Sequence, residues 1–173
     1  PVIHDAKTAG DFARELQLLL RTLGVSDANM EKGEMRVEAN ISISSTDTFG
    51  TKVEVKNLNS FKSVESAIAY ELKRHEEMLE RGEVITQETR GWDEVKGKTF
   101  SQRAKESAHD YRYFPDPDLP SLLITESVLS RIEETMPELP AFKREKYSNL
   151  GLTSKQIEVI IGDLRLDSFF NRT

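Results

Sequence analysis

The chain has 173 residues, of which 37% are hydrophobic and 31% are charged, and its formal net charge at pH 7 is −6. This balance is typical of a soluble protein with one good core and part of a second domain, and the absence of cysteine excludes disulfides and thiolate metal sites. The negative charge argues against a protein that coats nucleic acid, and no apolar run approaches the roughly 20 residues that span a bilayer.

The first part of the chain predicts a helix followed by two strands. Thr8 is a candidate cap, leucines recur behind it at helical spacing, and Gly24 provides a stop. The segments "MRVEANISI", residues 35–43, and "TKVEVKN", residues 51–57, alternate apolar and polar residues with a period of two. This period predicts two strands joined by a polar loop, with one apolar face and one polar face.

A second helix and a second pair of strands are predicted next. Apolar residues from Phe61 to Leu79 recur at helical spacing and predict a buried stripe that ends before Gly82. The segments "EVITQETRGW", residues 83–92, and "KTFSQR", residues 98–103, then predict strands that pair across the turn between them.

The composition changes at "FPDPDLP", residues 114–120, where three prolines forbid regular structure. Beyond it, residues 127–136 predict an amphipathic helix, and Pro140 is well placed to begin another. Thr153 and Gln156 form a candidate capping box ahead of a further apolar stripe, Ile157, Ile160, Ile161 and Leu164.

These elements predict the α+β class. We expect an antiparallel sheet with packed helices over residues 1–125, and the beginning of an all-helical domain over residues 126–173.

The polar face of the first strand pair is the main candidate site. If the hairpin is centred on Thr46, Glu38 lies opposite Glu54, and two facing carboxylates need a cation or nearby basic side chains. Lys56 and other basic residues on this face can supply that balance, so the pattern alone favours a solvated face of mixed charge over a site. The other basic residues are Arg36 and Lys52, and three asparagines lie at the same end: Asn40, Asn57 and Asn59.

Other motifs are weaker. Five residues separate Gly91 from Gly97 in "GWDEVKGKT", whereas a P-loop needs four, and the flanks predict strands, so we reject a P-loop. The three histidines, His4, His75 and His109, do not have the spacing of a metal motif, and His75 is expected to be structural. In "HDYRYF" the aromatic residues are expected to anchor a loop to the core.

Four segments carry a family resemblance: "MRVEANIS", "FGTKVEVKNLNSF", "QETRGWD" and "HDYRYFPDPDLP". In this order the chain resembles the B-type subunit of the glutamyl/aspartyl-tRNA amidotransferases, with the strongest match between Met35 and Pro120. The resemblance implies a cradle related to the glutamine synthetase and guanido kinase fold. It also implies a share in an ATP-dependent reaction: the side-chain carboxyl of Glu-tRNA(Gln) or Asp-tRNA(Asn) is activated as an acyl phosphate and amidated with ammonia from glutamine.

The resemblance also implies a site, cofactors and partners. Glu38 and Glu54 match acidic positions that bind metal in the family, although Asp is usual at the position of Glu38. ATP and Mg²⁺ are the implied cofactors, and the family's phosphoryl chemistry needs such a cation. Candidate nucleotide or substrate contacts are Asn40, Lys56, Asn57, Asn59 and Arg112, and no catalytic residue is assigned. The implied partners are two other subunits of the amidotransferase, namely the amidase (glutaminase) subunit and a small third subunit. Misacylated tRNA is the third implied partner. No membrane is implied, and the setting is a bacterial-type cytoplasm or an organelle.

Three functions are thus open. The chain is the middle of one subunit of a carbon–nitrogen ligase, a non-catalytic scaffold that docks partner subunits, or, less favoured, a stand-alone glutamine synthetase-like ligase. Metal-dependent nucleotide binding separates the first from the second. The choice between Glu-tRNA(Gln) and Asp-tRNA(Asn) stays open, and the opening "PVIHDAKTAG", which lacks an initiator Met, leads us to expect a fragment.

Overall fold

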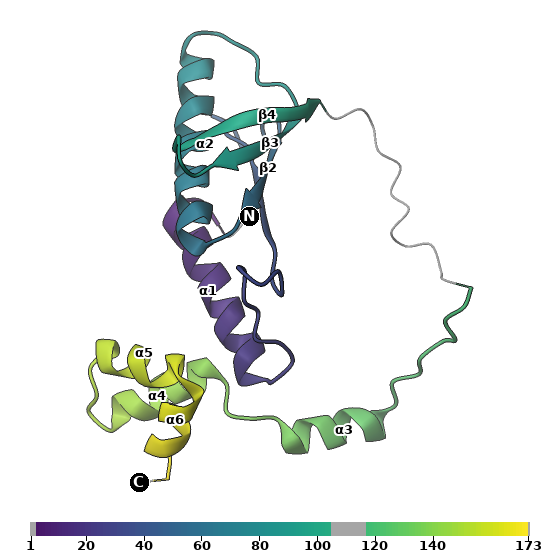
Figure 1. The fold of residues 1–173 in the computed structure, drawn as a ribbon, viewed down its shortest axis with the longest axis vertical. Coiled ribbons are helices and arrows are strands. Elements are labelled where there is room, and N and C mark those ends of the chain that lie inside the picture. The colour runs from purple at the N-terminus through teal and green to yellow at the C-terminus, as the bar shows by residue number, and fades with distance from the viewer. Residues whose placement is uncertain (1–2, 105–116, 173) are drawn as a thin grey trace. The chain divides into compact units, whose positions relative to one another are not determined.

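The computed structural model describes residues 3–104 and 117–172, in which six helices and four strands form (Figure 1). The predicted α+β class is confirmed. The chain divides into two compact units, which we describe separately: unit 1 is Pro1–Gln17 with Ala28–Ala108, and unit 2 is Leu18–Asp27 with His109–Thr173. The predicted domain boundary near residue 125 stays a prediction.

The first helix, α1 (Ala6–Thr22), begins three residues earlier than a Thr8 cap would place it. The Asp5 carboxylate accepts hydrogen bonds from the backbone N–H of Thr8 at 2.7 Å and from its hydroxyl at 2.7 Å. Asp5, not Thr8, therefore caps the helix, because a carboxylate at this position satisfies a free N–H of the first turn. Gly24, at φ +67°, follows the helix end as expected.

The four strands of unit 1 form one sheet in the order β1 (Val37–Ile41), β2 (Val53–Leu58), β3 (Glu88–Asp93) and β4 (Lys98–Ala104). The β1–β2 and β3–β4 pairs are antiparallel, whereas β2 and β3 are parallel, so the sheet is mixed and not antiparallel throughout. The reason is α2 (Phe61–Glu80), which connects β2 to β3 as a crossover and returns the chain to the same end of the sheet.

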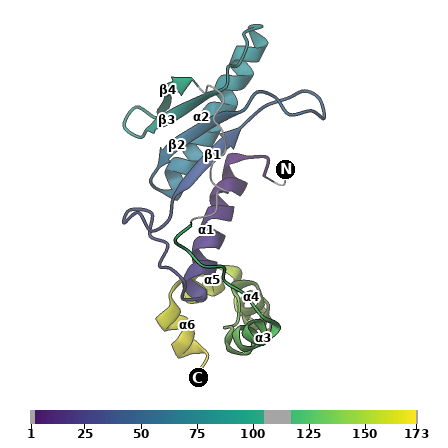
Figure 2. The ribbon, with the colours of Figure 1, turned by 90° about the vertical axis from the view of Figure 1, so that its right-hand side faces the viewer.

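Helix α2 covers one face of the sheet (Figure 2). Ser60 caps it by accepting a hydrogen bond from the Ser63 N–H, and Gly82 follows its end at φ +74°. Its buried residues are Ser63, Val64, Ala67, Ile68, Glu71 and His75. Leu79, which we expected to be buried, is 45% exposed. The face of α2 that contains the buried Glu71 returns two turns later at Met78, so Leu79 lies beside this face and not on it.

The core of unit 1 lies between α2 and the apolar face of the strands. Tyr70 and Trp92 pack edge to face across it, with ring centroids 6.3 Å apart. The buried members of this core are Ala39, Ile41, Val55, Leu58, Val64, Ala67, Ile68 and Trp92. The predicted alternation of apolar and polar residues in the first strand pair is thereby confirmed. The face of β1 and β2 that is turned away from this core carries the polar side chains.

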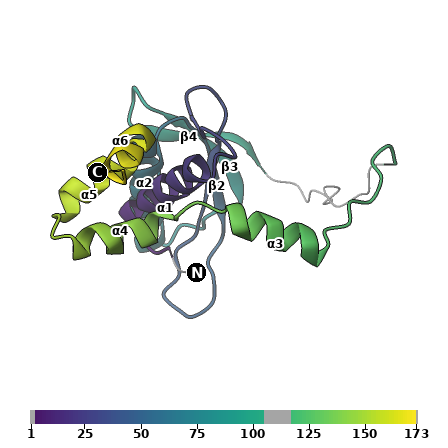
Figure 3. The same cartoon turned by 90° about the horizontal axis from the view of Figure 1, so that it is seen from below.

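Unit 2 contains the helices α3 (Glu126–Thr135), α4 (Pro140–Asn149), α5 (Ser154–Gly162) and α6 (Leu164–Phe170), of which α4, α5 and α6 pack together (Figure 3). Its core joins Tyr147, Ile157 and Ile161 to the half-buried Leu18, Leu152, Ile160 and Phe170. None of the residues of α3, all of them described, is buried.

The predicted starts of two unit 2 helices are confirmed. Pro140 occupies the first turn of α4, and Thr153 and Gln156 form the capping box of α5. Leu164, which we placed on the apolar stripe of α5, instead begins α6, because Asp163 caps a new helix there by accepting hydrogen bonds from the N–H groups of Arg165 and Leu166.

Candidate functional site

The polar face of the β1–β2 hairpin brings four of the predicted site residues together: Glu38, Asn40, Glu54 and Lys56. The pairing sets Asn40, not Glu38, opposite Glu54. The expected Glu38–Glu54 pair is therefore wrong by two residues, because the hairpin is centred one residue later than Thr46. Since a slip of two preserves the face, both carboxylates still lie on the same side of the sheet.

A β-bulge lies beside these carboxylates. The register shifts at Glu38, so that this one residue of β1 faces two residues of β2, Lys56 and Asn57. Asn57 has a positive φ of 64°, a conformation that asparagine tolerates better than most residues. A bulge redirects the side chains around it, and this one sets Lys56 beside Glu38.

Lys56 lies between the two carboxylates. Its Nζ is 3.7 Å from Glu38 Oε1 and 3.8 Å from Glu54 Oε2, while Arg36 Nε is 3.3 Å from Glu38 Oε1. The predicted balance of charge is confirmed for Lys56 and Arg36, whereas Lys52 makes no ion pair with either carboxylate among the described residues. The side chains of Glu38 and Lys56 are 32% and 33% exposed and that of Glu54 is 13% exposed, so the cluster is open to a ligand.

Thr89 holds the Glu54 carboxylate from the neighbouring strand. The two residues are paired in the parallel β2–β3 register, and Thr89 Oγ1 donates a hydrogen bond of 2.9 Å to Glu54 Oε2. Thr89 was not predicted from the sequence, because this contact depends on a parallel pairing that the strand pattern does not reveal. Its place in "QETRGWD", one of the four segments that carry the resemblance, was the available signal.

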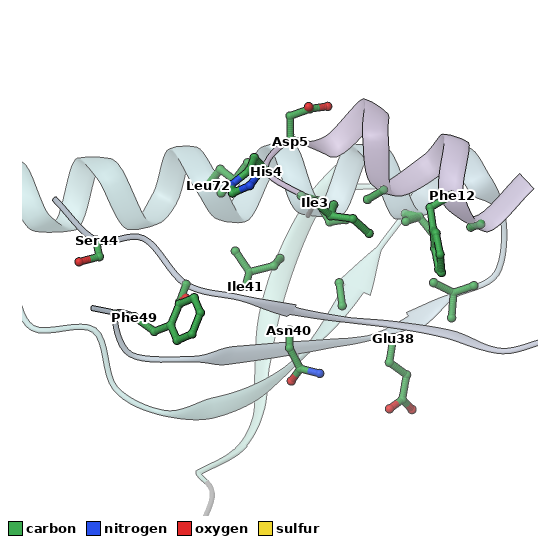
Figure 4. Close-up of a pocket in the computed structure, with 18 of the residues that line it drawn as sticks. Ile3, His4, Asp5, Phe12, Glu38, Asn40, Ile41, Ser44, Phe49 and Leu72 are labelled. Carbon is green, nitrogen blue, oxygen red and sulfur yellow. The ribbon is translucent and has the colours of Figure 1, made fainter. Parts of the chain in front are cut away.

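A groove of about 780 Å³ runs along β1, the edge strand, and is lined by parts of α1, β1, the β1–β2 loop and α2. Figure 4 shows Ile41 pointing toward the helices and Glu38 and Asn40 pointing to the opposite side of β1. The interior of the groove is therefore mainly apolar, and the two polar side chains lie at its rim.

The remaining predicted site residues are not part of this cluster. Asn57 is exposed in the bulge, and Asn59 is exposed one residue beyond β2. Arg112 and the loop "HDYRYF" lie outside the described residues, as does the beginning of "FPDPDLP".

The carboxylate oxygens of Glu38 and Glu54 are the type of ligand that Mg²⁺ prefers, but two carboxylates are too few to enclose the ion with protein ligands alone. Across residues 3–104 and 117–172, no group of three or more His, Cys, Asp or Glu side chains is placed to hold a metal ion. Mg²⁺ is nevertheless commonly bound through one or two carboxylates together with water and substrate phosphates. Glu38 and Glu54, whose carboxylates already share one cationic group, fit that open arrangement.

A second charged cluster lies on the helix side of the same sheet, around the buried Glu71. Arg74 donates to its carboxylate from Nε at 3.0 Å and from Nη2 at 2.7 Å, the Thr99 hydroxyl donates to Oε1, and Arg90 Nε lies 3.2 Å from Oε1. His75 Nε2 lies 3.2 Å from Oε2, although neither ring nitrogen of His75 has a hydrogen-bond partner of normal geometry in the described structure.

This environment keeps Glu71 ionised. Burial raises the pKa of its carboxyl, but His75, Arg74 and Thr99 beside it favour the charged form more strongly and lower the pKa to about 2. Glu71 thus joins α2 to β3 and β4 as a fixed charge, and His75 lies in the core, as expected for a structural histidine.

Comparisons with known proteins identify the family. Residues 1–130 match the model of the GatB/GatE catalytic domain. Over 99% of its length the chain is 47% identical to the B-type subunit of the aspartyl/glutamyl-tRNA(Asn/Gln) amidotransferase of Persephonella marina, and over its full length it is 44% identical to that of Chlorobium chlorochromatii; each match covers 37% of the relative.

A chloroplastic/mitochondrial protein is similar to the same extent. The chain is 43% identical, over 99% of its length, to the B-type subunit of the glutamyl-tRNA(Gln) amidotransferase of Physcomitrium patens and covers 31% of it. The chain thus spans about a third of the length of these relatives. In the described part of the chain, no helix is long and apolar enough to cross a membrane. The chain belongs to the GatB/GatE catalytic-domain family.

Proposed function

We propose that this chain is part of an ATP-dependent tRNA amidotransferase, a carbon–nitrogen ligase that uses glutamine as its amide donor. Its part is to activate the side-chain carboxyl of Glu-tRNA(Gln) or Asp-tRNA(Asn). The family membership supports the class of reaction. The observation that carries the location of the chemistry is the pair of carboxylates, Glu38 and Glu54, held on one open face around a shared cation.

The proposed reaction has two steps. A carboxylate oxygen of the aminoacyl side chain attacks the γ-phosphorus of ATP, and the bond to ADP breaks, leaving an acyl phosphate. Ammonia then attacks the acyl carbon, phosphate leaves with the bonding electrons, and loss of a proton gives the amide. The main difficulty is the negative charge of the triphosphate beside the attacking carboxylate, so the site must hold positive charge at the phosphate oxygens.

Glu38 and Glu54 would hold Mg²⁺ at this point. When bound, Mg²⁺ screens the phosphate oxygens and orients the triphosphate. Thr89 keeps the Glu54 carboxylate in one orientation through its hydrogen bond of 2.9 Å, a role that neighbours of metal-binding carboxylates commonly have. Asn40, directly opposite Glu54, is placed to donate a hydrogen bond to a ligand on the same face.

Four further residues complete the proposed contacts. Lys56 is a cation within reach of a phosphate bound at the two carboxylates. Asn57 and Asn59 lie at the same end of β2 and are exposed to a ligand. Arg112 remains a candidate phosphate or partner contact from the loop "HDYRYF".

The complex is also part of the proposal. We infer three partners: an amidase subunit that releases ammonia from glutamine, the small subunit of the same enzyme, and a misacylated tRNA, in a bacterial-type cytoplasm or an organelle. Because the chain spans only about a third of its B-type relatives, we expect it to form no amide on misacylated tRNA without the rest of the complex.

The decisive test compares Glu54→Gln with the wild-type sequence in the full complex. Gln keeps the shape and accepts the Thr89 hydrogen bond but lacks the charge that holds a cation, so Mg²⁺-dependent ATP cleavage driven by misacylated tRNA should fall by at least about 100-fold. Glu76→Gln, on the exposed side of α2, is the matched control and should leave the rate unchanged. An unchanged rate for Glu54→Gln at limiting Mg²⁺ would refute the metal assignment and favour the scaffold function.

A further inference from the structure

We propose that Lys56 is a built-in counter-cation, which occupies the space between Glu38 and Glu54 in the metal-free protein and is displaced when a divalent cation binds there. The proposal rests on the proposed function in one respect, namely that these two carboxylates are the metal ligands. It adds an exchange between a side-chain ammonium and the metal ion.

The distances show how loosely the ammonium is held. Lys56 Nζ is 3.7 Å from Glu38 and 3.8 Å from Glu54, beyond the 2.7–3.2 Å of a direct N–H···O hydrogen bond. By contrast, Lys143 Nζ in the core of unit 2 donates a hydrogen bond of 2.5 Å to Asp167. Lys56 therefore neutralises both carboxylates electrostatically without being bound tightly to either, which leaves the position open to exchange.

The local backbone explains why a lysine lies here. The bulge at Lys56 and Asn57 adds a residue to β2 opposite Glu38, which turns the lysine side chain toward β1. A lysine carries its charge on a flexible four-carbon stem, so it can leave without a change in the strand. An arginine would hold a carboxylate through two parallel hydrogen bonds and would exchange less readily.

The ammonium and a divalent cation cannot share this space. Mg²⁺ binds oxygen at about 2.0–2.1 Å, so the ligand oxygens of Glu38 and Glu54 must approach a common point that Lys56 now faces. A metal ion there would repel an ammonium group within about 4 Å. The side chain then moves outward on the same face, where the phosphates of a metal-bound nucleotide would lie. Lys56 thus balances the carboxylates before binding and can contact phosphate afterwards.

This exchange makes opposite predictions for two properties of one variant. Lys56→Met removes a like charge from beside the metal, so metal affinity should rise by about tenfold. The same change leaves the carboxylates without their shared cation, so the metal-free protein should melt at a lower temperature than the wild-type sequence. Saturating metal should then raise the melting temperature more in the variant than in the wild-type sequence, because binding stabilises the folded state by mass action.

The experiment titrates the 173-residue chain with Mn²⁺ and measures free Mn²⁺ by electron paramagnetic resonance, with melting curves in parallel. Lys52→Met is the matched control, since it removes one positive charge at the start of the same strand from a side chain that pairs with neither carboxylate in the described structure. It should change Mn²⁺ affinity less than about twofold. Lys56→Arg should weaken Mn²⁺ binding, so the proposal can be tested even if Lys56→Met does not fold.

The outcomes separate this proposal from the function on which it rests. Equal affinities for Lys56→Met and the wild-type sequence, or equal gains for Lys56→Met and Lys52→Met, would overturn the exchange while leaving the metal ligands in place. If Lys56→Met still raises Mn²⁺ affinity when Glu54→Gln is also present, Mn²⁺ binds elsewhere and the exchange is overturned. The absence of Mn²⁺ binding in every variant would overturn both the exchange and the metal assignment. A gain that depends on Glu54, together with unchanged ATP cleavage for Glu54→Gln in the complex, would support the exchange and reject the proposed function.

Discussion

On the two sides of the four-stranded sheet lie two carboxylates with opposite kinds of surroundings, Glu71 of helix α2 and Glu54 of strand β2. Glu71, on the face covered by α2, is fully buried and receives hydrogen bonds from Arg74 and Thr99. Glu54, on the other face, is partly exposed and shares Lys56 with Glu38 at 3.8 Å. Glu71 is enclosed by its partners, whereas Glu54, which Thr89 holds by a hydrogen bond, lies on a partly exposed face that a further cation can approach.

The difference teaches how the same chemical group serves stability in one place and binding in another. A buried charge must be paired within the protein, because its desolvation is costly and no water can replace a missing partner. A partly exposed charge loses less stability than a buried one if its partner leaves, since solvent screens what remains. Stability should therefore depend on Glu71, and ligand binding should depend on Glu54.

The largest expected effect is on the buried side. Glu71→Ala removes the fully buried carboxylate beside Arg74 and Arg90 and leaves these two cations only Glu88 as a shared partner among the described residues. The free energy of unfolding should fall by about 3 kcal/mol or more. Urea denaturation of the chain measures this loss. Glu76→Ala, an exposed change on the same helix, is the control and should cost less than about 0.5 kcal/mol. Equal midpoints for the two variants would remove the distinction between the two faces.

Acid should destabilise the protein through the same residue. The pKa of Glu71 is lowered from an ordinary value of 4.5 to about 2. The charged form is thus favoured in the folded state, so its contribution to stability is fully present above pH 4.5 and is lost as the pH falls toward 2. The urea midpoint should fall more steeply over this range for the wild-type sequence than for Glu71→Gln. Identical slopes would show that Glu71 titrates normally.

The smallest expected effects concern two threonines, one on each side of the sheet. Each donates a hydrogen bond to the carboxylate on its own side. Thr99→Val removes the donor to Glu71 and should cost about 1–3 kcal/mol of stability without changing Mn²⁺ binding. Thr89→Val removes the donor to Glu54 and should cost about 1 kcal/mol or less but weaken Mn²⁺ binding by about 10-fold or more. Mn²⁺ titrations and urea denaturation of both variants check the pair, and Thr89→Ser should restore binding. Equal losses of Mn²⁺ affinity in Thr89→Val and Thr99→Val would contradict the assignment.

Much of the fold could be predicted from local patterns. The alternation in residues 35–43 and 51–57, the apolar spacing of α2, the capping box at Thr153 and the proline at position 140 each act over a few residues, so the sequence reveals them directly. The even spacing between Glu38 and Glu54 was likewise sufficient to place both on one face in the expected register and in the observed one, which differs from it by two residues. The family, too, was recognisable from four short segments, and the comparisons confirm it.

Only the tertiary structure decided which charged groups meet. The parallel pairing that places Thr89 beside Glu54 depends on the crossover helix. The contact of Lys56 with Glu38 depends on a β-bulge that the residue pattern does not predict. The buried stripe of α2 was expected to be apolar, yet it includes Glu71 and His75, because Arg74, Arg90 and Thr99 from different elements converge on one carboxylate. Hydrophobic period is a property of neighbouring residues, whereas charge compensation depends on distances between segments far apart in the chain, and those distances exist only once the chain has folded.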